Sequence, residues 1–378
     1  MNVIEAIDKN IGEVRTESLD MSVGEIIALH QERELVIQPD FQRLFRWSFQ
    51  QRSRLIESLL LELPIPSIFV IEKESGVLEL IDGLQRVSSL LHFISAESLN
   101  KSAAAHPDPD APDEEEQPFT PLRLEGCDLV GELNGHTFED LPITLRLRLK
   151  RTGIRTVIIK RQSSQFLRYE MFKRLNTGGS KLSDQDIRNV NARMLGESGS
   201  AFYEMLMTCA RYPSFRTTVE LLSQTSIESR GDQELVLRFF AAKNYREHFK
   251  GNVGDWLDGF MEAVLLKGLS FGDEDVQVFK DVFDTLAAQF GQNAFVKYRA
   301  GQPIGGVAPA YFEAVSIGAM LRLDELRTLD ADVAQQALAA AVESPAFRSV
   351  TGPGANSLPK LNRRIEIITD AIDGADVL

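Results

Sequence analysis

The feature that most constrains this fold is a change in hydrophobic patterning near residue 195. Before it, short β-rich runs such as SIFVIE and VLELI alternate with helical patterns. After it, strand signals nearly vanish, and amphipathic stretches such as ELVLRFFAAKNY and DVQVFKDVFDTLAAQF follow one another. We therefore predict an α+β protein with a mixed domain over residues 1–195 and an all-helical domain over residues 196–378.

Composition narrows the class of protein. A hydrophobic content of 43% and a charged content of 25% are typical of soluble globular chains, and a net charge of −14 argues against non-specific coating of DNA. Cys127 and Cys209 lie far apart without metal-ligand spacing, and neither a signal peptide nor a membrane-spanning apolar run is apparent. We expect a cytoplasmic protein with reduced thiols, no membrane association, and an acidic mobile insertion at residues 100–121.

The mixed half predicts a regular series of elements. A helix from Val23 to His30 leads into a strand at ELVI, and the apolar positions of FQQRSRLIESLL share one helix face up to the PIP that ends it. SIFVIE and VLELI flank a glycine-containing turn and predict a hairpin. A helix with apolar residues at Leu84, Val87 and Leu91 follows directly.

The stretch LELIDGLQRVSSLLHF joins this strand to this helix through Asp82 and Gly83, with Gln85 and Arg86 in the first helical turn. A helix N-terminus carries free backbone N–H groups and a partial positive charge, so it binds anions. Gly83 would let a phosphate approach the backbone, Arg86 would clamp its oxygens, and Asp82 would cap the helix, hold Arg86 or bind a divalent metal. A plain turn beside a solvated arginine is the structural alternative.

Two other stretches carry similar chemistry. PDFQRLFRW places Gln42 and Arg43 after a predicted strand, and its Trp47 fits either a core position or a base-stacking role. FKRLNTGGSKLSDQDIR holds a glycine-rich loop before a helix that Ser183 would cap. Such a loop suits a phosphate or a metal-bound phosphate, but a helix C-cap followed by a flexible turn fits as well. The loop residues are Asn176, Thr177, Gly178 and Gly179.

A basic run, RLRLKRTGIRTVIIKR, predicts a short helix followed by a strand. It would supply a surface that follows DNA phosphates, or a solvated face that balances the acidic remainder of the chain. The DNA-contact candidates are Arg146, Arg148, Lys150, Arg151 and Arg155. In the helical half, Arg238 lies among apolar neighbours, which predicts an internal pair with a carboxylate.

The ordered motifs PDFQR…W, LIESLLLELPIP, IDGLQR, FKRLNTGGSKLSDQDIR and RGDQELVLR resemble the N-terminal domain of GmrSD-type, modification-dependent (type IV) restriction proteins. SspE-like and BrxU-like phage-defence proteins share this domain. The resemblance runs from about Val23 into the helical half. It implies a ParB/sulfiredoxin-like fold, nucleotide binding, NTP hydrolysis with Mg²⁺ or another divalent cation, and defence against foreign or modified DNA.

Carried over residue by residue, the D-G-Q-Q-R box of that family falls on Asp82 to Arg86, with Leu84 in place of its first glutamine. The resemblance thereby implies catalytic roles for Asp82, Gln85 and Arg86, and a metal at Asp82. Nucleotide contacts would come from Gln42, Arg43, Gly83, Arg86 and the loop from Asn176 to Gly179. Many relatives carry a C-terminal HNH-type nuclease domain, whereas the five histidines of this chain are scattered.

Three functions follow as hypotheses. The first is an NTP-binding and NTP-hydrolysing sensor or regulator that serves a separate nuclease or effector protein. The second is a metal-dependent DNase or nickase in the mixed domain. The third is a non-catalytic DNA- or protein-binding regulator, which Leu84 favours. The expected partners are an NTP, DNA that includes modified phage DNA, and the effector; a homo-oligomer is compatible with the sequence, and no zinc or organic cofactor is expected.

Overall fold

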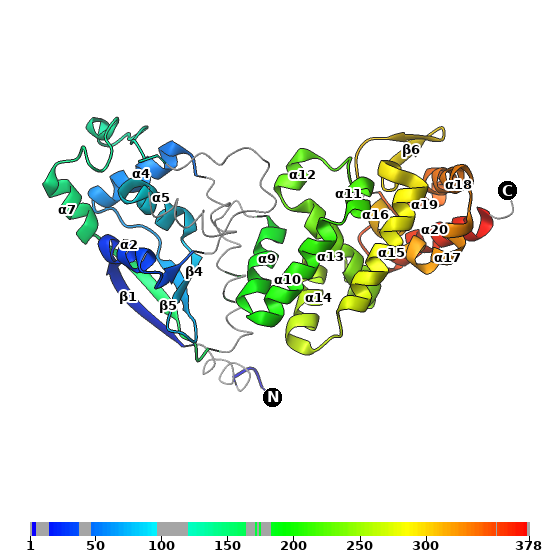
Figure 1. Ribbon diagram of the computed structural model, residues 1–378, viewed down its shortest axis with the longest axis horizontal. Coiled ribbons are helices and arrows are strands. Elements are labelled where there is room, and N and C mark those ends of the chain that lie inside the picture. The colour runs from blue at the N-terminus through cyan, green and yellow to red at the C-terminus, as the bar shows by residue number, and fades with distance from the viewer. Residues whose placement is uncertain are drawn as a thin grey trace. The chain divides into compact units, whose positions relative to one another are not determined.

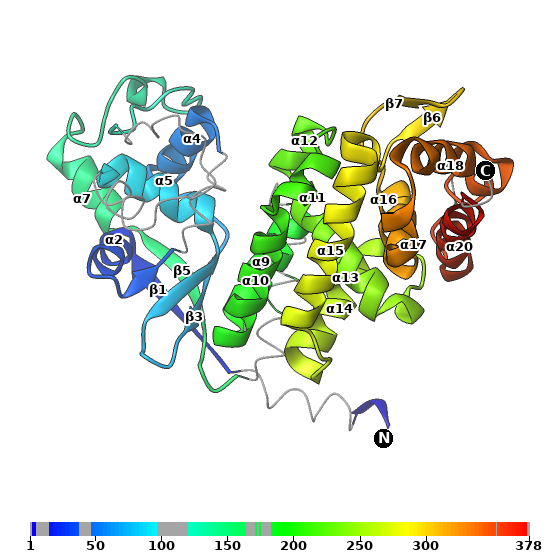
Figure 2. The same ribbon diagram turned by 45° about the vertical axis from the view of Figure 1, so that its right-hand side comes forward.

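The computed structural model describes residues 2–4, 15–37, 47–96, 120–163, 171, 174, 183–352 and 354–375. The chain divides into two compact units, Met1–Lys181 and Leu182–Leu378. The first combines a sheet with helices and the second is mostly helical, as the two views show (Figures 1 and 2), so the predicted α+β class is confirmed. The division falls before α9 (Asp184–Met194), whereas the sequence placed the boundary after this helix.

The first unit is built on a five-stranded sheet with the order β1-β5-β3-β4-β2. The pairs β1–β5 and β3–β4 are antiparallel, whereas β3–β5 and β2–β4 are parallel. The strands are β1 (Thr16–Ser22), β2 (Leu35–Val36), β3 (Ile68–Glu72), β4 (Leu78–Asp82) and β5 (Gly153–Ile159). The helices are α2 (Val23–Gln31), α4 (Phe49–Leu60), α5 (Leu84–Ile94), α7 (Ile143–Arg151) and the 3₁₀ helix η1 (Gly131–Leu133).

The predicted apolar face of α4 is present up to Leu60, where the helix ends; Leu63, predicted on the same face before the PIP, lies beyond the helix and is exposed. Leu55, Ile56 and Leu59 are buried, because residues three and four positions apart share one side of a helix. The same helix carries the buried carboxylate of Glu57, which accepts the backbone N–H groups of Leu129 (2.9 Å) and Val130 (2.7 Å). α4 therefore packs on the core and also binds the backbone at Leu129 and Val130, which follow the acidic insertion. Residues 100–119 of that insertion lie outside the described part of the chain.

Two strand regions were not predicted. β1 has the polar sequence TESLDMS, and its polar residues are tolerated because the strand lies at the sheet edge. In the second unit β6 (Lys297–Arg299) and β7 (Gln302–Ile304) form a hairpin of three-residue strands, too short to show an alternating pattern. Ala300 (φ 52°) and Gly301 (φ 75°) make its turn, the left-handed geometry that suits a tight hairpin.

The second unit packs its helices around an aromatic core. Phe215 lies edge-on to Phe283 (5.1 Å between ring centroids, 76°), and Phe239 lies edge-on to Phe279 (5.3 Å, 85°), which is the preferred geometry of aromatic pairs. After α9 the elements are α10 (Glu197–Ala210), α11 (Pro213–Thr218), α12 (Gln224–Glu228), α13 (Gly231–Asn244), η2 (Arg246–His248), α14 (Val253–Lys267), α15 (Asp273–Phe290), η3 (Gly291–Asn293), α16 (Pro309–Leu321), α17 (Leu323–Thr328), α18 (Ala331–Glu343), α19 (Pro345–Ser349) and α20 (Leu358–Ala375).

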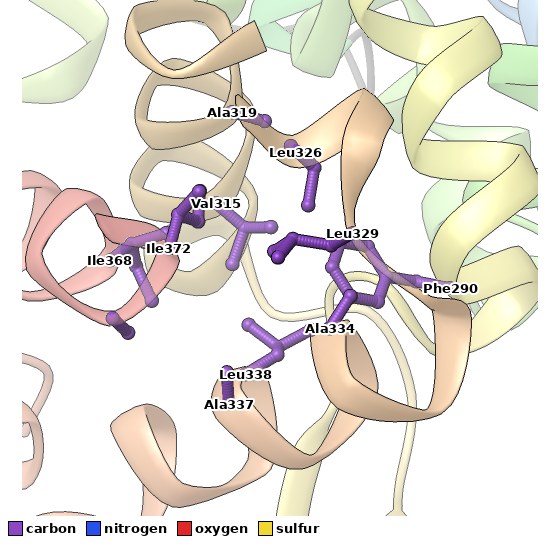
Figure 3. A pocket seen from close by; sticks show the side chains of 11 residues that line it. Phe290, Val315, Ala319, Leu326, Leu329, Ala334, Ala337, Leu338, Ile368 and Ile372 are labelled. Atoms are coloured by element: carbon purple, nitrogen blue, oxygen red, sulfur yellow. The ribbon is translucent and has the colours of Figure 1, made fainter. Parts of the chain in front are cut away.

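One enclosed pocket of the second unit lies within this core (Figure 3). Its lining is entirely apolar and includes Phe290, Val315, Leu326 and Ile368. The cavity measures about 10 Å³, which is the minimum that one water molecule needs, and it offers no polar partner. We interpret it as a packing gap between α16, α18 and α20.

A chain of buried charges crosses the second unit. Arg238 donates to Glu234 (2.8 Å) and to Glu313 (2.6 Å), and Glu313 also pairs with Arg364, which is 2% exposed. Burial by itself lowers the pKa of Arg238, but the two carboxylates outweigh burial and raise it. The predicted internal pairing of Arg238 is confirmed.

Composition also predicted reduced thiols and no membrane association. Cys127 and Cys209 are buried, and burial raises the pKa of their thiols to about 11 and about 12, so neither is an activated nucleophile. Among the described residues no helix combines the length and hydrophobicity needed to cross a bilayer.

Candidate functional site

The predicted hinge lies where β4 passes into α5. Asp82 ends the strand, Gly83 occupies the turn, and the helix begins at Leu84. Gly83 has a φ of 103°, and an added Cβ would lie 2.5 Å from Cγ2 of Ile68. Both the left-handed backbone and the lack of space therefore require glycine at this position.

Arg86 is held rigidly at this hinge. Its Nη2 donates to Oδ2 of Asp82 (3.0 Å) and to the backbone oxygen of Ser67 (3.0 Å), and its side chain is 14% exposed. Its Nε is buried and has no hydrogen-bond partner among the described residues. Because these two bonds already fix the guanidinium, little further ordering of Arg86 is needed when an anion binds beside it.

The N-terminus of α5 adds backbone donors to the same place. Its N-cap residue Gly83 has no side chain, so no capping group of its own covers the first-turn amides. The partial positive charge of the helix end therefore lies beside Arg86. In α9 the equivalent position is filled differently, since Ser183 and Asp186 form a reciprocal capping box (3.1 Å in each direction). Among the described residues, the N-terminus of α5 therefore differs from that of α9 in lacking a side-chain cap.

The backbone of Trp47 lies beside the hinge. Oε1 of Gln85 accepts the N–H of Trp47 (3.1 Å), and Nε of Arg52 donates to the Trp47 carbonyl (2.8 Å). The end of the PDFQRLFRW stretch is therefore fixed between α4 and α5. Gln42 and Arg43 themselves lie outside the described residues, as do the loop residues Asn176, Thr177, Gly178 and Gly179.

A histidine not selected from the sequence continues this network. His92 accepts at Nδ1 from Nη1 of Arg52 (3.1 Å), and its Nε2–H donates to the Thr120 carbonyl (2.8 Å), which requires a neutral ring. Burial lowers the pKa of His92; the Thr120 contact works in the opposite direction, and the charge of Arg52 lowers the pKa further. The signal that could have identified it is its spacing, four positions after Ser88 on the inner face of α5.

We expect the first unit to lose stability as the pH falls below about 6.5, the ordinary histidine pKa. His92 and His30 both have a lowered pKa in the folded state, mainly through burial, so the unfolded chain binds more protons in this window and acid favours unfolding. Urea unfolding between about pH 7 and pH 5 would measure it.

The His92→Asn variant should show a weaker pH dependence than the wild type, and the double variant with His30→Asn a weaker one still. The exposed His248 of the second unit is the matched control, and His248→Asn should leave the slope unchanged. Equal slopes in all four proteins would contradict this account.

The basic DNA-contact candidates are largely paired. Arg148 bonds Glu62 (2.8 Å), Arg155 bonds Asp20 (3.1 Å) and Arg146 bonds Glu139 (2.5 Å), while Lys150 lies 5.4 Å from the ring centre of Phe138. Arg151 makes no ion pair within the described part of the chain. This is a surface of mixed charge, and its contact with DNA stays a prediction.

The donor set for a divalent cation is small. Residues 2–4, 15–37, 47–96, 120–163 and the other described segments contain no group of three or more His, Cys, Asp or Glu side chains arranged for a metal. Asp82 nevertheless suits Mg²⁺, because its Oδ2 is bound to Arg86 while its Oδ1 makes no hydrogen bond to any described residue. Mg²⁺ in nucleotide sites commonly uses one or two carboxylates together with substrate phosphates.

Comparison with known proteins identifies one family. Residues 23–192 match the family described as GmrSD restriction endonuclease, N-terminal domain. This segment contains α4, the hinge, α7 and nearly all of α9. No curated protein and no solved structure matches the chain.

Proposed function

Because residues 23–192 belong to the GmrSD restriction endonuclease N-terminal domain family, we propose that this protein is the nucleotide-binding component of a restriction system directed against modified DNA. In this proposal it works in the cytoplasm, binds an NTP with Mg²⁺, and regulates a separate nuclease or effector protein.

The observation that carries this proposal is the geometry of the hinge. Three groups lie within one strand-to-helix turn: the fixed Arg86 guanidinium, the N-terminus of α5, which has no side-chain cap, and Oδ1 of Asp82, which bonds no described residue. Positive donors and one carboxylate at a helix N-terminus are the groups that a magnesium-bound polyphosphate needs.

Each group has a distinct role in this scheme. Arg86 neutralises phosphate oxygens through its remaining N–H donors, and the α5 amides orient the same phosphate. Asp82 would hold Mg²⁺, which when bound neutralises charge on the phosphates. Gln85 positions Trp47 through its amide oxygen, so we assign it the placement of the neighbouring segment.

A second candidate function is nucleotide binding without turnover. Leu84 occupies the position of the family's first glutamine, and its side chain is buried at 9% exposure. A buried leucine cannot orient a water molecule or a phosphate, since it offers no hydrogen-bonding group. A protein of this kind would signal through nucleotide occupancy alone.

Calorimetric titration with each of the four common NTPs in Mg²⁺ tests binding, and phosphate release measured on the same samples tests turnover. We expect heat from at least one NTP, with phosphate release that is slow in the wild type and faster in Leu84→Gln. Absence of heat with every NTP would exclude the proposed site. Binding without phosphate release in both proteins would favour the second candidate.

A further inference from the structure

A groove on the first unit is not used by the nucleotide site. It measures about 880 Å³ and lies between the end of α4, the chain that follows it, α7 and the start of β5. α7 contacts α4, and both helices are labelled in Figures 1 and 2. Clefts of roughly 300–1,000 Å³ are large enough to enclose several side chains of a ligand.

The lining of this groove combines polar and apolar groups, and two of its leucines are exposed. Leu63 is 43% exposed on one wall and Leu147 is 40% exposed on the other, and Leu59 lies buried between them. Ile143, Leu147 and Arg151 follow one another four residues apart, so they form a single outer stripe of α7. Large apolar side chains gathered on two facing walls are typical of a protein-binding surface.

The polar part of the lining carries charges of both signs with a small positive excess. The lining contains three arginines and two acids, so it has one positive charge in excess within a chain of net charge −14; these residues are Arg148, Arg151, Arg155, Glu62 and Asp20. Two of the arginines are paired with these acids, which leaves Arg151 as the unpaired cation of the described lining. A single unpaired cation between leucines is a poor surface for following DNA phosphates, but it complements a carboxylate beside an apolar side chain.

We propose that this groove binds an acidic amphipathic helix of the effector protein that the nucleotide-binding unit regulates. The occupant lays leucine-like side chains between Leu63 and Leu147, and its flanking carboxylates meet Arg151 and the rim arginines. The nine residues of α7 offer about 13 Å of helix to pack against, so the recognised helix spans between two and three turns. The partner's identity as an effector rests on the proposed function, whereas the groove and its chemistry do not.

The test uses the full chain and a fluorescent leucine–glutamate peptide of about 15 residues, long enough to form a helix. Its twin carries lysine in place of every glutamate. We expect the acidic peptide to raise the fluorescence anisotropy on binding and the basic twin to leave it unchanged. Leu147→Asp should weaken binding about tenfold or more, since it removes one buried apolar contact and adds a like charge.

Matched variants show whether the peptide binds in the groove or elsewhere on the surface of this unit. Arg151→Glu should weaken the acidic peptide and allow the basic twin to bind, whereas Arg123→Glu, also at an exposed site of this unit, should do neither. Leu129→Asp is the control for Leu147→Asp, because Leu129 is 65% exposed outside the groove.

The outcomes also distinguish this proposal from the nucleotide site. Leu147→Asp should bind NTP like the wild type, and Arg86→Ala should bind the acidic peptide like the wild type. The proposal is overturned if the acidic peptide fails to bind, or if Leu147→Asp and Leu129→Asp behave alike. It is also overturned if duplex DNA, and not the peptide, binds with sensitivity to Arg151→Glu.

Discussion

Replacement of Arg86 by alanine is expected to weaken NTP binding by about 100-fold or more. Each charge-assisted hydrogen bond contributes roughly 1.5–3 kcal/mol, and the substitution removes both the charge and the donors of the guanidinium from the hinge. The variant also loses the link between Asp82 and Ser67 that orders the turn. Calorimetry of the wild type and the variant with the same Mg²⁺-NTP would measure the loss.

Two further proteins make this result specific. Arg86→Lys keeps the charge but lacks the planar fork, so we expect intermediate affinity. Arg161→Ala removes an exposed arginine of the same unit, whose Nη1 bonds the Glu74 carbonyl, and should bind like the wild type. Circular dichroism melts identify any variant that fails to fold. A folded Arg86→Ala with unchanged affinity would remove the hinge from the proposed mechanism.

Replacement of Glu313 by glutamine is expected to destabilise the second unit by about 3–5 kcal/mol. Glu313 and Arg364 are almost fully buried and paired with each other, so loss of the carboxylate charge leaves a guanidinium uncompensated in the core. Arg238 suffers less, because Glu234 still pairs with it. Urea unfolding followed by helical circular dichroism would show a lower midpoint at an unchanged slope.

A double variant tests whether the cost comes from the orphaned charge. Glu313→Leu combined with Arg364→Met removes both charges and should recover most of the lost stability, since apolar replacement of a whole buried pair is often neutral. Glu366→Gln is the control: it breaks the exposed Arg363–Glu366 pair on the same helix and should change the midpoint little. If Glu313→Gln and the double variant had equal stability, the loss would come from altered packing and not from an uncompensated charge.

The local elements of the first unit were predictable from sequence. The Asp82–Gly83 turn between β4 and α5 and the hairpin of β3 and β4 lie where the residue patterns placed them, and in the second unit Ser183 caps α9 as predicted. These features depend on neighbours within a few residues, so they are encoded by periodicity, proline and glycine positions, and capping side chains. The family match over residues 23–192 agrees with the motifs read from the chain.

The missed elements have a common cause. β1 carries polar residues that only its pairing with β5, far along the chain, orders into a strand. The partners of Arg86 and His92, namely the carbonyls of Ser67 and Thr120, lie 19 and 28 residues away, and backbone carbonyls carry no residue-specific signal. The groove could not be predicted either, because the leucines that line it come from two segments far apart in sequence.

The sequence by itself determined the α+β class, the local elements, and the residue types that gather at the strand-to-helix turn, because these follow from spacing along a few turns of chain. Only the tertiary structure decided which of those groups are already engaged. It pairs Arg86 with Asp82 and Ser67, pairs Arg146 and Arg148 of α7 with carboxylates, and buries Arg238, Glu313 and Arg364 together. The physical reason is that charge pairing and burial depend on distances between residues remote in sequence, which a linear pattern does not contain.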